Sequence, residues 1–112
     1  MSGLSGQLGY RSHVFTANTT GTELGVVGGA AASAAAQPAL TGFLHTITIS
    51  ADSTANTITV YDGTSTSGTV VAEVITQSNT QAATLTFDIQ LQTGLFVVVS
   101  GGTTPAVTVT YT

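Results

Sequence analysis

Apolar and polar residues alternate with a period of two along most of the chain, and this pattern constrains the fold more than any other feature. It is clearest over residues 84–91, where one set of positions reads Leu85, Phe87, Ile89 and Leu91 and the other reads Thr86, Asp88 and Gln90. Successive side chains of a β-strand point to opposite faces. The alternation therefore predicts a strand with one face buried and the other in water.

Segments of this kind recur from Leu40 onward at a spacing of roughly 8–12 residues and are separated by turn residues such as Asp62-Gly63. The predicted strands cover residues 43–50, 57–61, 69–76, 84–91, 95–100 and 107–111. Two shorter strands are predicted earlier, over residues 10–18 and 23–27. About eight strands joined by turns predict an all-β fold, an antiparallel β-sandwich with a jelly-roll-like arrangement.

Two details of this prediction concern the C-terminal part. The run from Leu95 to Ser100 is continuously apolar up to its last residue, which predicts a strand buried on both faces. Residues 101–105, with two glycines and a proline, are predicted to form a hairpin loop before the last strand.

The composition changes near Leu40, and we predict two regions on that basis. Residues 1–39 form an N-terminal arm with one or two short strands and an alanine-rich connector, and residues 40–112 form the β-sandwich core. The tract Ala30–Ala36 is too short for a stable isolated helix, so one or two docked turns and an extended connector both remain open. Residues 1–10 lack the features of a signal peptide, and the uncharged stretch Leu24–Leu44 is too weakly apolar to predict a membrane span.

Only six of the 112 residues are charged, Arg11 being the single cation. Charged residues make up 5% of the chain, whereas about 25% is usual for a soluble domain. One arginine cannot neutralise a nucleic-acid backbone, so the composition excludes a nucleic-acid-binding protein. Five scattered carboxylates and two histidines offer no nucleophile–base–orienter set, so we predict that the protein is not an enzyme. Because there is no cysteine, neither a disulfide nor a thiolate metal site is available.

Several residues could hold a ligand, but each has a simpler interpretation. His13 and His45 could meet at a metal, and Asp52 with Asn56 or Asp62 with Ser65 could bind calcium. Each of the two calcium candidates offers only one carboxylate, so we favour turn capping for them. For the histidines we favour a partly buried or surface position with a backbone partner, and we predict no metal and no cofactor. Tyr61 and Tyr111 could stack on a sugar ring, although a tyrosine at a strand end is more often a core-edge residue.

The low charge also bears on the edges of the predicted sheets. Soluble β-proteins protect edge strands with lysine, proline or inward-pointing charges. This chain has no lysine, and five carboxylates cannot protect eight strands. We therefore predict an obligate homo-oligomer in which copies of the chain cover the edges, with a trimer as the favoured state.

The strand segments also resemble a known group of proteins. The run Gly42–Ile49, the segment Thr57–Ser65, the tripeptide Ser67-Gly68-Thr69, the segment Thr93–Val97 and the segment Pro105–Tyr111 carry the resemblance. They are similar to the Thr/Gly-rich β-sandwich virion proteins of tailed bacteriophages, some of which are capsid decoration (cement) proteins. The similarity covers about residues 40–112. The N-terminal region does not match the usual glycine-rich pattern of decoration proteins.

The resemblance implies a non-enzymatic protein on the outer surface of a phage capsid. Its expected partners are further copies of itself and the major capsid protein of the head, without nucleic acid or membrane. The segment from Tyr10 to Val27 holds the only arginine, and we predict that it contacts the partner through Tyr10, Arg11, His13, Phe15 and Glu23. A phage tail or fibre appendage domain and a carbohydrate-binding β-sandwich module remain as alternatives.

Overall fold

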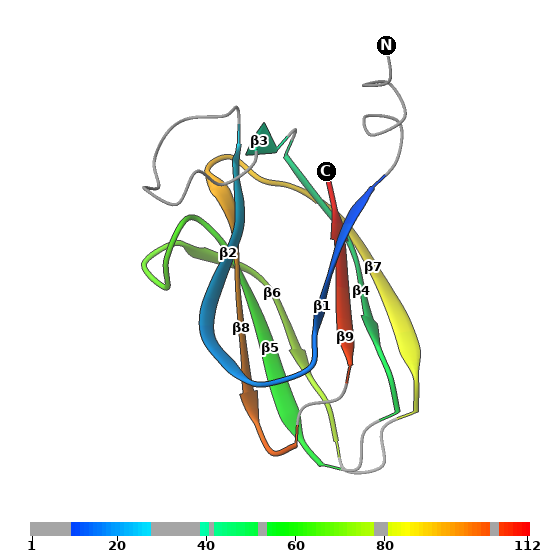
Figure 1. The fold of residues 1–112 in the computed structure, drawn as a ribbon. Helices are drawn as coiled ribbons and strands as arrows, with labels where there is room; N and C mark the ends of the chain where they lie inside the picture. The colour runs from blue at the N-terminus through cyan, green and yellow to red at the C-terminus, as the bar shows by residue number, and fades with distance from the viewer. Residues whose placement is uncertain (1–9, 28–38, 41, 52–53, 78–80, 104–105) are drawn as a thin grey trace.

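Two β-sheets face each other across a common core (Figure 1). The computed structural model describes residues 10–27, 39–40, 42–51, 54–77, 81–103 and 106–112. Within these residues there are nine strands and no helix. Eight strands pair antiparallel, and the ninth is a two-residue strand that pairs parallel with its neighbour. The predicted all-β fold with two antiparallel sheets is confirmed.

We call the four-stranded sheet "sheet A" and the five-stranded sheet "sheet B". Across sheet A the order is β1 (Arg11–Phe15), β9 (Val107–Tyr111), β4 (Phe43–Ile49) and β7 (Ala83–Gln90). Across sheet B the order is β3 (Ala39–Leu40), β2 (Thr19–Val27), β8 (Gly94–Gly101), β5 (Asn56–Asp62) and β6 (Thr69–Ile75). Among the described strands, β1 and β7 are therefore the two edges of sheet A.

The strand pairs are nested along the sequence. The pair β5·β6 forms a hairpin, the pair β4·β7 encloses it, the pair β2·β8 encloses both, and the pair β1·β9 is outermost. The members of these successive pairs lie alternately in sheet B and sheet A. The chain therefore crosses repeatedly between the two sheets, which brings the first and last described strands side by side in sheet A (Figure 1).

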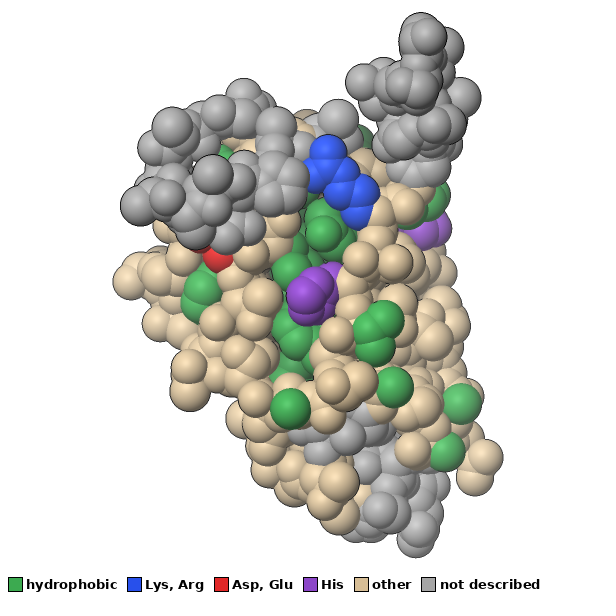
Figure 2. Space-filling model, in the orientation of Figure 1, with side chains coloured by type: hydrophobic (Ala, Val, Ile, Leu, Met, Phe, Trp, Pro, Cys, Tyr) green, Lys and Arg blue, Asp and Glu red, His purple; other side chains and the backbone are tan. Residues whose placement is uncertain are grey.

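The core lies between the inner faces of the two sheets, and hydrophobic side chains are visible between them on the face drawn in Figure 2. Its fully buried side chains include Leu44, Ile47, Ile58, Val60, Leu95, Val97, Val107 and Val109. Most are β-branched, and such residues pack well on a pleated surface. Burying one side chain of this size contributes about 1.5–3 kcal/mol. The apolar positions of the alternating pattern are therefore also the main source of the stability of the fold.

Two expectations about the C-terminal part are wrong. Strand β8 is buried on its inner face only, because Phe96 and Val98 lie half-buried on the outer face of sheet B. The residues between β8 and β9 do not form a hairpin loop, because β8 belongs to sheet B and β9 to sheet A. A glycine-rich loop can join two strands of the same sheet or two strands of different sheets, and alternation within the flanking strands does not distinguish these two connections.

The N-terminal region contributes strands to both sheets. Strand β1 pairs with β9, and β2 pairs with β8. The alanine tract Ala30–Ala36 lies outside the described residues, as do residues 1–9, so the division into an arm and a core stays a prediction. In the part of the chain that the structure describes, no helix has the length and apolar character needed to cross a membrane.

Candidate interaction surface

The outer face of sheet A carries two rows of small side chains. Ser12, Thr110, Thr46 and Thr86 are register partners across the four strands, and so are Val14, Thr108, Thr48 and Thr84. We call these eight side chains the hydroxyl grid. Their neighbours along β4 and β9 are buried in the core, so the grid itself points away from sheet B. Seven of its eight members carry a hydroxyl group, and none is charged.

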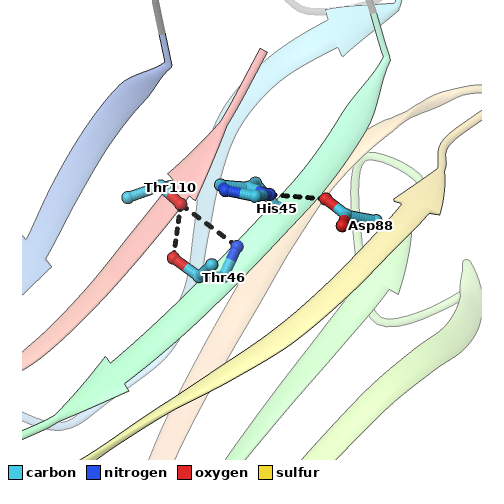
Figure 3. Close-up of polar contacts among 4 residues, drawn as sticks. All are labelled: His45, Thr46, Asp88 and Thr110. Carbon is cyan, nitrogen blue, oxygen red and sulfur yellow. Dashed lines mark hydrogen bonds and ion pairs between the residues drawn. The ribbon is translucent and has the colours of Figure 1, made fainter.

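Hydrogen bonds between strands fix part of the hydroxyl grid. The Oγ1 atoms of Thr46 and Thr110 lie 2.5 Å apart, and the backbone N–H of Thr46 donates to Thr110 Oγ1 at 3.1 Å (Figure 3). The Oγ1 atoms of Thr48 and Thr84 lie 3.0 Å apart. Thr46 is buried, whereas Thr110, Thr48 and Thr84 are partly or fully exposed. Because a hydroxyl group both donates and accepts, these three side chains can still bond to a polar partner above the sheet. The grid therefore suits a neutral, polar partner surface.

A cluster of three residues lies at one end of the grid. The ring of Tyr10 stacks on the imidazole of His45, with 3.9 Å between ring centroids and 8° between planes. The same imidazole faces Asp88 on β7, with 2.5 Å between His45 Nδ1 and Asp88 Oδ1 (Figure 3). This is the single ion pair within the described residues, and it forms only when the histidine is protonated.

A β-bulge explains how His45 and Asp88 come together. Leu44 pairs with Ile89 and Thr46 pairs with Thr86, so two residues of β7 lie opposite His45 alone. Asp88 adopts a φ of 49°, in the left-handed region that Asp tolerates better than most residues. The bulge turns the Asp88 carboxylate toward the imidazole and leaves 59% of the Asp88 side chain exposed at the edge of the sheet.

The five predicted partner-binding residues divide between the two sheets. Tyr10 joins the cluster with His45, while Arg11, His13 and Phe15 lie along β1 with Phe15 buried. The rings of His13 and Phe15 lie against each other, 4.5 Å between centroids. Glu23 lies on β2, across from Phe96 on the outer face of sheet B, so the structure does not bring it together with the other four.

Two of these five residues carry unpaired charge. Arg11 is exposed and has no ion-pair partner among the described residues. Glu23 has a buried Oε2 atom without a hydrogen-bond partner in the same part of the chain. Burial raises the pKa of Tyr111, the register partner of Arg11 on β9, and the Arg11 guanidinium acts in the opposite direction.

Sequence reasoning did not identify His45, Asp88 and Thr46 as parts of the surface. The alternation placed Asp88 on the outer face, but it could not show that β4 lies beside β7. The rarity of the residue types was the available signal, because His45 is one of two histidines and Asp88 is the only charge in its predicted strand.

The outer face of sheet B is more apolar. The rings of Tyr61 and Phe96 meet edge to face, with 6.2 Å between centroids and 65° between planes. A shallow pocket of about 280 Å³ lies nearby, lined by residues 18–20 and 98–101. Tyr111 faces the core and is 6% exposed, so it cannot serve as a platform for a sugar ring.

The carboxylate of Asp62 holds a loop. It accepts hydrogen bonds from the backbone N–H groups of Gln92, Thr93 and Gly94, at 2.9, 2.8 and 3.2 Å. These residues link β7 in sheet A to β8 in sheet B.

In the described part of the chain, no group of three or more His, Asp or Glu side chains is placed to hold a metal ion.

Comparison with known proteins gives no match to a family model, a curated protein or a solved structure. The function of the surface is therefore inferred from the side chains that form it.

Proposed function

We propose that this chain is a non-enzymatic virion structural protein, a capsid decoration (cement) protein of a tailed bacteriophage. It self-associates, with a trimer favoured, and binds the major capsid protein on the outer surface of the head. It requires no cofactor and binds neither nucleic acid nor membrane. The resemblance of residues 40–112 to phage virion proteins supports this proposal, as does the low content of charge.

The hydroxyl grid is the observation that carries the proposal. It covers the outer face of sheet A without one charged side chain and extends between two edge strands that no described strand covers. A protein that stands alone in solution usually protects such a sheet with charges. A surface of adaptable hydroxyl groups suits permanent contact with a polar protein surface, and tight binding does not require charge there.

We also propose a jelly-roll sandwich with an N-terminal arm. The nested pairs β1·β9, β2·β8, β4·β7 and β5·β6 support the jelly roll, because this fold pairs eight strands around two Greek keys. In this proposal Tyr10, Arg11 and His13 contact a neighbouring protein along β1, and Glu23 does so from β2. Phe15 is buried in the core and supports the His13 ring from within.

Rebinding to phage particles tests the capsid-binding surface. Thr48 and Thr59 are both half-buried threonines on central strands, one on the outer face of sheet A and the other on that of sheet B. We expect Thr48→Arg to reduce occupancy on particles depleted of the protein by about tenfold or more, since an unpaired charge would enter the contact. The control variant Thr59→Arg should bind like the wild type. Equal binding by both variants would overturn the assignment of this surface.

Immunogold labelling of purified particles locates the protein, and mass spectrometry of the same particles detects it. Gold on the head is expected, and gold confined to the tail would replace the proposal with the appendage alternative.

A chain lacking residues 1–9 keeps every described strand, so its occupancy on particles tests the N-terminal arm without removing β1 or β2.

The Tyr61–Phe96 pair favours one further candidate, a carbohydrate-binding module, because aromatic rings can stack on sugars. A glycan array probed with the wild type and with Tyr61→Ala decides this candidate. Binding that Tyr61→Ala abolishes would support it, and an array without signal would remove it.

A further inference from the structure

Three side chains on the outer face of sheet A are linked in a row that crosses the sheet. Tyr10 directly precedes β1, His45 lies on β4 and Asp88 lies on β7. The ring of Tyr10 stacks on the imidazole of His45, and the same imidazole contacts the Asp88 carboxylate (Figure 3). Because the strand order is β1, β9, β4 and β7, the row joins one edge of the sheet to the other. We call these three side chains the strap.

The strap adds a link that the backbone does not provide. Among the described strands, β1 pairs with β9 alone, through residues Arg11–Phe15. The Tyr10 side chain reaches past β9 and rests on a residue of β4. The stack therefore ties the start of β1 to a strand with which β1 shares no backbone hydrogen bond.

The backbone of sheet A is shaped around the contact between His45 and Asp88. The register shift in the pair β4·β7 places two residues of β7 opposite His45, and Asp88 has a φ of 49°. Left-handed backbone of this kind persists in residues other than glycine where the surrounding structure fixes it. The carboxylate thus holds the imidazole plane on which the Tyr10 ring stacks.

His45 is the member of the strap whose charge ordinarily changes between about pH 5 and pH 8. Aspartate and tyrosine side chains ordinarily titrate at about pH 4 and about pH 10. A protonated imidazole donates a charge-assisted hydrogen bond to the carboxylate, about twice as strong as a neutral one. It also places a cation against the face of the Tyr10 ring, which attracts it. One proton therefore strengthens both links of the strap.

Within the described residues, no other titratable side chain faces the strap. Strands β4 and β7 carry none besides His45 and Asp88. Those of β1 and β9 belong to rows of core-facing positions, on the opposite face of the sheet: Arg11, His13 and Tyr111. The other described carboxylates belong to sheet B: Glu23, Asp62 and Glu73. Thr112 lies at the same end of sheet A, where its oxygen accepts backbone hydrogen bonds from residues 42 and 43, and a terminal carboxylate does not titrate near neutral pH.

We propose that the strap is a pH-sensitive device that holds the start of β1 on sheet A while His45 is protonated and releases it more readily once the imidazole is neutral. The same segment carries Tyr10, Arg11 and His13, so the proton controls how available these residues are to a neighbouring protein. The inference concerns the single chain and does not depend on the identity of the capsid partner.

Trypsin measures this release at one site, because Arg11 is the only arginine and the chain has no lysine. Cleavage after Arg11 requires β1 to open locally, so its rate follows the population of the open form. Each rate is divided by that of an unstructured peptide covering residues 6–17, which removes the pH dependence of the protease. We expect the relative rate to be about threefold lower at about pH 6 than at about pH 8.5.

Substitutions identify the group responsible, each compared with a reference peptide of matching sequence. His45→Gln should give the faster relative rate at both pH values. The matched control His13→Gln changes the other histidine, whose ring lies against Phe15, and should keep the wild-type pH dependence. Asp88→Asn keeps a residue that tolerates the left-handed conformation and should weaken the pH dependence. Equal relative rates at the two pH values in the wild type, or a pH dependence that survives His45→Gln, would overturn the proposal.

Nuclear magnetic resonance of the wild type tests the same coupling without a substitution. The ring protons of Tyr10 should shift along the same titration curve as the imidazole protons of His45, because the two rings are stacked. Tyr10 resonances that stay fixed while His45 titrates would refute the strap. Such a failure would leave the capsid proposal intact, since the location of the protein on phage heads is decided by labelling.

Discussion

The outer faces of the two sheets differ in how completely each is covered by its own side chains. On sheet B, the ring of Phe96 packs so closely on Gly21 that a Cβ atom at that glycine would lie 2.1 Å from the ring. On sheet A, the hydroxyl grid leaves a polar layer between two edges that no described strand covers. The comparison indicates that sheet B is packed over β2 and β8 by its own Phe96 ring, with Ile75 of its edge strand β6 still exposed, whereas sheet A presents a continuous polar layer.

The strongest test of this contrast is Gly21→Ala. The added Cβ would displace the Phe96 ring, so we expect a loss of about 2–3 kcal/mol in the free energy of unfolding, measured by urea denaturation. The matched change on sheet A, Ser12→Ala at an exposed position, should cost about 0.5 kcal/mol or less. Adding Phe96→Ala to Gly21→Ala should cost less than the sum of the two single changes, and strict additivity would contradict the contact.

Two carboxylates, Asp62 in sheet B and Asp88 in sheet A, provide the next test. Asp62 accepts three backbone hydrogen bonds from the loop that links the sheets, so Asp62→Ala should lower the free energy of unfolding by about 2 kcal/mol. Asp88→Asn retains a residue that tolerates the left-handed conformation and removes only an exposed ion pair, so about 0.5 kcal/mol is expected. If Asp88→Asn proves the more destabilising, the edge of sheet A contributes more to the fold than this comparison allows.

The hydrogen-bonded pair Thr46 and Thr110 tests how far the hydroxyl grid stabilises the sheet. Thr110→Val removes the partner of both the Thr46 hydroxyl and the Thr46 backbone N–H, which should cost about 1 kcal/mol. Thr46 is buried, so its unpaired hydroxyl accounts for much of that cost. Replacing both threonines with valine should therefore cost less than the two single changes together, as a double-mutant cycle by chemical denaturation would show.

The smallest effect is expected at alkaline pH. Burial raises the pKa of Tyr111 above its ordinary value of 10.0, so the unfolded chain loses this proton first as the pH increases. Stability should therefore be fully present below pH 10.0 and should decrease as the pH rises from there toward the folded pKa. Tyr111→Phe should flatten this decrease, and Arg11→Gln should steepen it, because Arg11 lowers the same pKa. Denaturation at about pH 9 and about pH 11 compares the three proteins.

The sequence predicted the strands well because each depends on local alternation. In β7, Thr86 and Asp88 were placed outward and Leu85 inward from spacing alone. Alternation carries no information on which strands are neighbours, so it missed the pairing of β4 with β7 and the β-bulge at Asp88. For the same reason it did not predict that Tyr10 stacks on His45, since that contact requires β1, β9 and β4 to lie side by side in this order.

The nested order of the strand pairs has a consequence for folding. The β5·β6 hairpin closes the shortest loop, and each enclosing pair must close a longer one at a greater entropic cost. Among the described strands, β1 pairs with β9 alone, so this outermost pair is expected to form late. The β1 edge of sheet A is then completed after the core. A nascent chain would not present this edge to other copies until most of its apolar surface is already buried.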